Sequence, residues 1–223
     1  VIPNQGNYFI KGMNDIKFAN GADFLINLNK NESRIVVDNY YDFFTYQYGY
    51  QLKLLDLKNK IYTKKNSGEF SKIQYALNKP YYLPDKDITL PFSFYETGKL
   101  KEGNGNPYSK EYDSLADYSI NDNGIIELRI PWLLIQAKDP SQKEFIGDFI
   151  QNGISDSTFV NQIFVGALYF NEDGKLIDSL PSVDKGTLLK MNGYKWENWN
   201  KPIYKERLKQ SYFIVKDLYS EYK

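Results

Sequence analysis

The sequence predicts an all-β protein: an antiparallel, jelly-roll-like β-sandwich with a short helical turn after Pro131 and a C-terminal helix. Three observations lead to this prediction. Short runs of alternating apolar and polar residues fill the chain up to about residue 180. Turn signals rich in Gly and Asn separate these runs. The only long run at helical spacing covers residues 201–222. We expect residues 1–223 to form a single domain.

The expected strands begin with a hairpin over residues 22–44. In "ADFLINLN" the apolar residues Phe24, Ile26 and Leu28 alternate, "NKNES" supplies a turn, and residues 33–44 form the second strand. Further strands follow the turn signal at 66–68 and the tight turn "NDNG" at 121–124, and a clear hairpin covers 163–181. The C-terminal helix begins near Pro202, because proline suits the first helical turn.

Residues 123–149 are the least ordinary stretch of the chain. Glu127 and Arg129 share one face of a strand, where a cross-strand ion pair is the simplest role and a catalytic carboxylate is the alternative. Pro131 cannot donate to a β-ladder, so the strand ends there. We expect Trp132 to begin a helical turn and to be largely buried over the end of the sandwich.

Composition excludes several classes of function. The 223 residues contain no Cys and no His, so disulfides, thiolate nucleophiles, His-based triads and imidazole metal ligands are ruled out. A net charge of zero argues against nucleic-acid binding, which needs a basic surface. An enzyme would depend on carboxylates, Tyr or a hard metal ion. No cofactor is expected. Because the first residue is Val and no signal-peptide pattern follows it, we expect the sequence to be an excised piece of a longer chain or a processed product.

In residues 123–149 a glutamate-bearing strand runs into Ile130-Pro131-Trp132, a short turn follows, and the chain returns through Gly147-Asp148. This pattern resembles the late strand of family 9 carbohydrate-binding modules and related DOMON-like sandwiches. The strand in "GADFLINLN" is similar to an earlier strand of that family. With "SRIVVDNYYD", "ETGKL" and "YKWENWNKPIYKERLKQSYF", the chain also looks like the C-terminal extracytoplasmic region of large membrane-associated bacterial proteins. This resemblance implies that residues 1–223 are the C-terminal module of a longer chain.

The resemblance covers about half of the chain and implies a sandwich fold and sugar binding. It implies a calcium site more weakly. In that family the opening strands carry a substrate-facing Trp and acidic calcium ligands, and this chain begins after them. The acidic turns "NDNG" and "NEDG" lack the spacing of an EF-hand, and ordinary hairpin turns explain both.

Two aromatic segments are candidate ligand platforms, because sugars stack their C–H faces on aromatic rings. In "NYYDFFTYQYGY" (39–50) the candidates are Tyr41, Tyr46 and Tyr48, and core packing is the alternative for these rings. In "YKWENWNK" (194–201) the candidates are Trp196 and Trp199. Their alternative role is to anchor the C-terminal helix.

The long polar loop 96–119 is the third candidate. Glu96, Asn104, Asn106 and Asp117 offer the carboxylate and amide groups that hold sugar hydroxyls, and a rigid structural loop is the alternative. These observations favour a non-catalytic carbohydrate-binding-like module of a bacterial envelope-associated protein. It would be extracytoplasmic, at the cell surface or secreted. Its partners would be a polysaccharide or oligosaccharide and the remainder of a membrane-associated chain. A carboxylate-based glycoside hydrolase or lyase and a structural or protein-interaction domain remain as alternatives.

Overall fold

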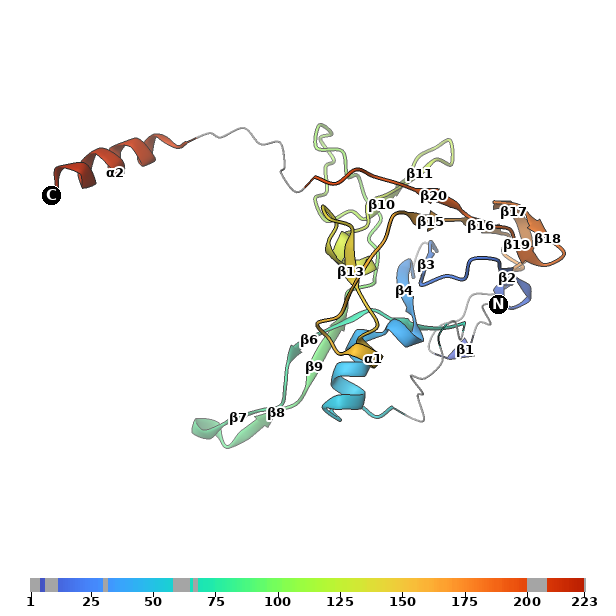
Figure 1. The fold of residues 1–223 in the computed structure, drawn as a ribbon, viewed down its shortest axis with the longest axis horizontal. Helices are drawn as coiled ribbons and strands as arrows, with labels where there is room; N and C mark the ends of the chain where they lie inside the picture. Colours follow the sequence, from blue (N-terminus) through green and yellow to red (C-terminus); the bar gives the residue numbers. More distant parts are fainter. Residues whose placement is uncertain are drawn as a thin grey trace.

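The computed structural model describes residues 5–6, 12–29, 32–57, 65, 68–199 and 208–222. Within these ranges the chain is mostly β-structure, arranged in small sheets of two to four strands, with a helix near the C-terminus (Figure 1). The all-β prediction is therefore confirmed. Among the described residues the sheets do not merge into two continuous layers, so no clear sandwich is present there.

The largest sheet contains the first predicted hairpin. Its strand order is β1 (Gln5–Gly6), β5 (Glu69–Lys72), β4 (Arg34–Asp38) and β3 (Phe24–Asn27). Strands β3 and β4 pair antiparallel, with Phe24 opposite Val37. All of β4 is buried, because Val36 packs on one side of the sheet and Ile35 on the other. A continuous apolar run suits a strand covered on both faces.

Residues 39–51 are helical, although the sequence predicted that the second strand continues to Phe44. The segments are a 3-10 turn (Asn39–Tyr41) and a π-helix (Thr45–Gln51). The carboxylate of Asp38 accepts the backbone N–H two residues later, and that of Asp42 accepts the N–H three residues later. These caps satisfy the first N–H groups of each turn, so they outweigh the β-propensity of the aromatic residues. The prediction of only two helical regions was wrong for this reason.

The middle of the chain forms a long two-stranded ribbon and, beyond the 96–119 loop, a hairpin. The ribbon pairs β6 (Gln74–Asn78) with β9 (Ser93–Glu96) and β7 (Tyr81–Leu83) with β8 (Ile88–Leu90), and a 3-10 turn (Pro84–Lys86) closes it. The hairpin pairs β10 (Tyr118–Ile120) with β11 (Ile126–Leu128) around the predicted turn 121–124. In Figure 1 the ribbon extends away from the other sheets.

The last third of the described chain contains three sheets and a further hairpin. The first sheet contains β12 (Ala137–Asp139), β13 (Glu144–Ile146) and β14 (Ser157–Phe159), and the second pairs β15 (Ile163–Val165) with β20 (Asn192–Tyr194). The third contains β18 (Val183–Asp184), β19 (Thr187–Leu188) and β2 (Lys17–Phe18). The hairpin pairs β16 (Ala167–Phe170) with β17 (Leu176–Leu180). The pair β16–β17 confirms the hairpin predicted around residues 171–174. The parallel pairing of β19 with β2 joins residues 187–188 to residues 17–18, far apart in the sequence.

Four short helical segments accompany these strands. They are 3-10 turns at Met13–Asp15 and Trp132–Ile135, α1 (Phe149–Asn152) and α2 (Gln210–Glu221). The turn at 132–135 and helix α2 confirm both predicted helices, although residues 201–207 of the second lie outside the described ranges. Within those ranges, every helix is too short or too polar to cross a membrane.

The core is divided into small clusters rather than one continuous layer. One cluster joins Ile35 with Leu100 and Tyr118, and another joins Tyr46 with Phe149. The remaining two are centred on Met13, Val36 and Phe70 and on Ile16, Leu188 and Met191. The first cluster also contacts Leu134 and Ile135, so the turn after Pro131 packs against the core on the Ile35 side of the main sheet.

Candidate functional site

The three tryptophans of the chain lie together. The ring centroid of Trp132 is 5.3 Å from that of Trp196 and 6.3 Å from that of Trp199. Two motifs that are far apart in the sequence, Ile-Pro-Trp and "YKWENWNK", therefore form one aromatic cluster. The tyrosine that ends β20, Tyr194, extends the cluster, because its ring stacks on Trp196 at 6.1 Å with an interplanar angle of 16°.

Local backbone structure places Trp132 in this cluster. Pro131, with φ −58°, precedes the 3-10 turn and fixes its start. Gln136 ends the turn in the left-handed region at φ 62°, and its carbonyl accepts the N–H of Ile146. The side-chain amide of Gln136 donates to the carbonyl of Tyr41 at 2.6 Å. The turn is thus held from both sides, and Trp132 is intermediate in burial, neither fully covered nor as exposed as Trp199.

The turn 139–143 holds the other two tryptophans. The indole N–H of Trp196 donates to the carbonyl of Pro140 at 2.8 Å, and the backbone N–H of Trp199 donates to the carbonyl of Ser141 at 3.1 Å. Asp139 shapes this turn by accepting the N–H and hydroxyl of Ser141 at 2.9 and 2.6 Å. Hydrogen bonds from Ser141 and Gln142 keep the pKa of Asp139 below its ordinary value, so this carboxylate stays charged.

Exposure separates the tryptophan that anchors the segment from those that face solvent. Trp196 is 8% exposed, whereas Trp199 is 40% and Tyr194 is 59% exposed. We call the surface formed by Tyr194, Trp132 and Trp199 the aromatic face. The ammonium group of Lys143 lies 5.8 Å from the ring centroid of Trp196 and adds a polar edge. An aromatic surface with polar groups at its border can stack against a sugar ring and hydrogen-bond its hydroxyls.

Scans against protein-family models, curated proteins and solved structures gave no match to this chain.

The tyrosines of the 39–50 segment do not join the aromatic face. Tyr46 is buried against Phe149, and Tyr41 packs against the same cluster. Tyr48 contacts Phe44 and Phe92, with ring centroids 5.2 and 5.4 Å apart. These placements favour core packing over a ligand platform, because each of the three rings packs against neighbouring aromatic residues.

The candidates in the polar loop hold the loop together. Asn104 accepts the backbone N–H of Asn106 at 2.9 Å and donates to Ser109 at 2.9 Å. Asn106 in turn accepts the N–H of Tyr108 at 3.0 Å. Asp117 accepts the N–H of Lys101 at 2.9 Å. The loop is therefore ordered by its own amides and carboxylates, which favours the structural alternative.

Glu96 and Arg129 are also used within the fold. A carboxylate oxygen of Glu96 lies 3.2 Å from the guanidinium Nε of Arg34, and the other lies 3.7 Å from the ammonium of Lys72. The guanidinium of Arg129 donates to the carbonyls of Ser114 and Ala116, both at 2.7 Å. Arg129 therefore fixes the end of the polar loop. Glu127 is exposed on β11.

Tyr40, Lys65 and Asp148 form a cluster of interacting polar side chains. The hydroxyl of Tyr40 donates to both oxygens of Asp148, at 2.8 and 3.1 Å, and the ammonium of Lys65 contacts the same carboxylate. Burial works to raise the pKa of Asp148, but the hydrogen bonds from Lys65 and Tyr40 outweigh it and leave the pKa below its ordinary value. This carboxylate is a satisfied structural anion. Within the described ranges, no group of three or more acidic residues is arranged to hold a metal ion.

The sequence analysis missed Tyr194 and the turn 139–143 as parts of the site. Tyr194 is two residues before Trp196, and the period of an extended chain puts such residues on the same face. That rule could have identified Tyr194 from the sequence. The contact of the 139–143 turn with the tryptophans had no signal in the sequence, because it joins segments with no shared motif.

Proposed function

We propose that this chain is a non-catalytic glycan-binding module of a bacterial envelope-associated protein, with its binding site on the aromatic face. The observation that carries the proposal is the half-exposed ring of Trp199 next to Trp132, with the exposed ring of Tyr194 beside them. Glu197 and Asn198 are exposed on the same segment, and Gln142 is exposed on the adjoining turn. These groups supply the hydrogen-bond partners that a sugar needs beside a stacking surface.

We also propose that the small sheets belong to a β-sandwich of the kind found in family 9 carbohydrate-binding modules, and that the module works outside the cytoplasm as part of a longer chain. Support for the sandwich comes from the Ile-Pro-Trp turn, because its residues Leu134 and Ile135 pack against the core cluster that contains Ile35 of the main sheet. Support for the location comes from the resemblance to extracytoplasmic regions of membrane-associated proteins.

The site predicts a particular kind of binding. Stacking on neutral rings would supply most of the contact, so affinity should be weak, about micromolar to millimolar. Binding should depend little on salt, because no cluster of like charges drives it. Asp139 is engaged in its own turn and contributes to the shape of the site rather than to long-range attraction.

A glycan array followed by calorimetric titration tests the proposal. Trp199→Ala should weaken binding at least tenfold, because it removes the exposed stacking ring. Tyr108→Ala is a matched control, since Tyr108 is an aromatic residue 95% exposed in the polar loop, and it should leave affinity unchanged. No binding to any bacterial or plant polysaccharide would overturn the proposal. Hydrolysis or elimination of a bound glycan by the purified chain would favour the enzyme alternative.

A further inference from the structure

The aromatic face offers two separate stacking positions. One is formed by Trp199 and Trp132, whose ring centroids lie 6.3 Å apart. The other is Tyr194, which among the described residues makes a ring contact with Trp196 and with neither of the other tryptophans. Trp196 is buried and contacts both Tyr194 and Trp132, so it supports both positions. A pyranose ring is about as wide as one aromatic ring, so a single sugar can stack at only one of them.

Asn192 adds a polar group next to Tyr194. Strand β20 pairs Tyr194 with Ile163 and Asn192 with Val165, so the two-residue period of a strand puts the side chains of Asn192 and Tyr194 on one face. Asn192 is exposed, and its side-chain amide makes no hydrogen bond to a described residue. Such an amide can both donate to and accept from a sugar hydroxyl. The asparagines of the polar loop lack this freedom, because they bond the backbone of their own loop.

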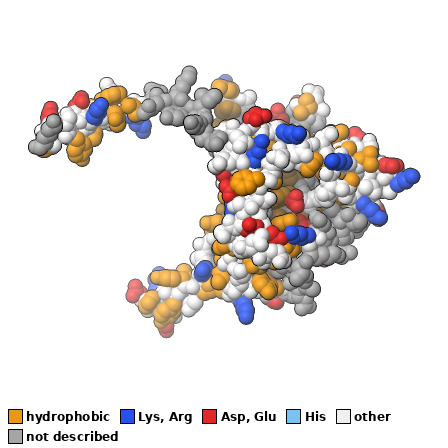
Figure 2. All heavy atoms as spheres, viewed as in Figure 1, with side chains coloured by type: hydrophobic (Ala, Val, Ile, Leu, Met, Phe, Trp, Pro, Cys, Tyr) orange, Lys and Arg blue, Asp and Glu red, His pale blue; other side chains and the backbone are white. Residues whose placement is uncertain are grey.

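The charged groups around the aromatic face balance one another. The turn that holds the tryptophans contributes Asp139 and Lys143, and the segment after β20 contributes Lys195 and Glu197. Figure 2 shows basic and acidic side chains interspersed over the side of the molecule in view. A polyanionic glycan is attracted by a surface of one sign, which this balance does not provide. The site therefore favours a neutral glycan.

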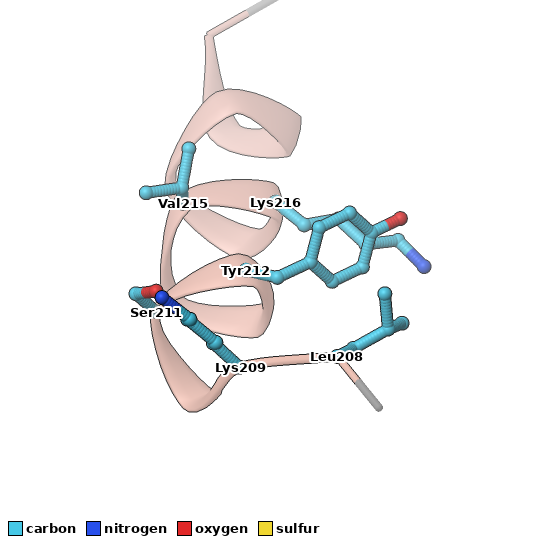
Figure 3. Close-up of a pocket in the computed structure, with 6 residues that line it drawn as sticks. All are labelled: Leu208, Lys209, Ser211, Tyr212, Val215 and Lys216. Carbon is cyan, nitrogen blue, oxygen red and sulfur yellow. The ribbon is translucent and has the colours of Figure 1, made fainter. Parts of the chain in front are cut away.

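The aromatic face is also better built for a ligand than the hollow beside α2. The lining residues of that hollow all belong to one segment, residues 208–216 (Figure 3). The aromatic face instead combines the turns 132–135 and 139–143 with the segment after β20, and hydrogen bonds from Trp196 and Trp199 hold that segment to the second turn. Side chains that are fixed before a ligand arrives lose less freedom on binding.

We propose that the aromatic face binds a neutral glycan chain lengthwise, over several consecutive sugars. This arrangement rests on the proposed function. One sugar stacks on Trp199 and Trp132, a later sugar stacks on Tyr194, and the amide of Asn192 bonds a hydroxyl beyond it. Figure 1 shows β20 and the residues after it in extended form, so Asn192, Tyr194 and Trp199 follow one another along the chain. Asn192 and Tyr194 therefore determine the length of glycan that binds best.

Calorimetric titration with neutral oligosaccharides of increasing length tests the proposal. The probes are glucose, xylose, mannose and N-acetylglucosamine oligomers, from single sugars to hexasaccharides. At least one series should bind, with an affinity that rises about tenfold or more from disaccharide to tetrasaccharide and then levels off. Equal affinity for the disaccharide and the hexasaccharide would overturn the proposal, and so would a failure of all four series to bind. In the second case, an acidic glycan found by the array would leave the proposed function standing.

Variants at exposed positions separate this proposal from the proposed function. Tyr194→Ala and Asn192→Ala should weaken binding of the tetrasaccharide, by about three- to tenfold for the single hydrogen bond of Asn192, and leave the disaccharide unaffected. Trp199→Ala should weaken both. Asn123→Ala is the matched control, since Asn123 is an exposed asparagine in the turn 121–124, and should bind normally. If Tyr194→Ala and Asn192→Ala bind the tetrasaccharide normally and Trp199→Ala does not, the lengthwise arrangement is wrong and the proposed function stands. If Trp199→Ala also binds normally, both are wrong.

Discussion

The rings of Trp132 and Trp196 lie 5.3 Å apart. This contact joins the turn after the Ile-Pro-Trp sequence to the segment that follows the last strand. Because the indole N–H of Trp196 also donates to the carbonyl of Pro140, that tryptophan is fixed by packing and by a hydrogen bond. Trp199 is then held at the edge of the cluster, with part of its ring in solvent. The arrangement separates a structural tryptophan from one available to a ligand.

Trp132→Ala tests the structural half of this arrangement. The ring contacts both other tryptophans but is partly exposed, so the loss should be about 2–3 kcal/mol of unfolding free energy, below the full cost of a buried Trp. Urea denaturation followed by circular dichroism measures it. Tyr108→Ala, at a fully exposed aromatic position, should change stability by less than about 0.5 kcal/mol. Equal effects of the two changes would mean that the cluster does not hold the segment.

Gly147→Ala tests the Gly-Asp return. A methyl group at Gly147 would collide with the carboxylate of Asp156. That carboxylate accepts the N–H of Asp148 at 2.8 Å and the amide of Asn152 at 3.0 Å, so it cannot move without losing both bonds. We expect a loss of about 1–3 kcal/mol in thermal or urea unfolding. At Gly105 nothing lies within contact distance, so Gly105→Ala should be neutral. A neutral Gly147→Ala would contradict the close approach.

Tyr40→Phe tests the link between the 3-10 turn Asn39–Tyr41 and α1. Tyr40 is buried, and its hydroxyl donates to the charged carboxylate of Asp148. Loss of a hydrogen bond to a charged group should cost about 1.5–3 kcal/mol. Tyr82 donates to Asp87 at the same distance of 2.8 Å but is exposed, so Tyr82→Phe is the matched control. It should cost under about 0.5 kcal/mol. If Tyr40→Phe and Tyr82→Phe lower the free energy of unfolding equally, burial does not strengthen the bond between Tyr40 and Asp148.

Asp38→Asn tests a pH dependence. Burial raises the pKa of Asp38 to about 6; the N–H of Tyr40 opposes the rise, and the charges of Asp23 and Glu69 add to it. The unfolded value is 3.8, so the folded state binds more protons between these values. The stabilisation from this group is therefore full below about pH 4 and is lost as pH rises to about 6.

An amide at position 38 keeps the oxygen that caps the turn but cannot ionise. The variant should lack the fall in stability across that window and should exceed the unmodified chain at pH 7 by up to about 3 kcal/mol. Urea melts at pH 4 and pH 7 measure the difference. A variant that is less stable than the unmodified chain at pH 7 would show that the charge of Asp38 is stabilising and that the account of its burial is incorrect.

Local patterns were enough to predict the strands and turns whose signals are complete within a few residues. The hairpin of β3 and β4, the turn at 121–124 and the β16–β17 hairpin each combine alternation with a turn signal. The Pro131 turn was also predictable, because proline both ends a strand and suits the start of a helical turn. Residues 39–51 were not predicted, because two capping aspartates decided between helix and strand there.

The site was harder to predict than the strands. Trp196 and Trp199 were both named because an aromatic pair flanked by amides suits a saccharide groove. The sequence could not show that Trp196 is buried and Trp199 is exposed. The hydrogen bond from Trp196 to Pro140 joins segments more than fifty positions apart. The candidates Asn104 and Asn106 have the right chemistry for sugar hydroxyls, yet their side chains bond the backbone of their own loop. A composition rule cannot tell a free amide from one used in a turn.

Intrinsic tryptophan fluorescence tests the central claim most directly. All three tryptophans belong to one cluster, so their emission reports on the aromatic face and its immediate support. Titration with a glycan that the array identifies should give a saturable change in emission, with a dissociation constant of about micromolar to millimolar. It should be lost in Trp199→Ala and kept in Tyr108→Ala. Saturable glycan binding by calorimetry with unchanged tryptophan emission, or binding undiminished in Trp199→Ala, would contradict the account.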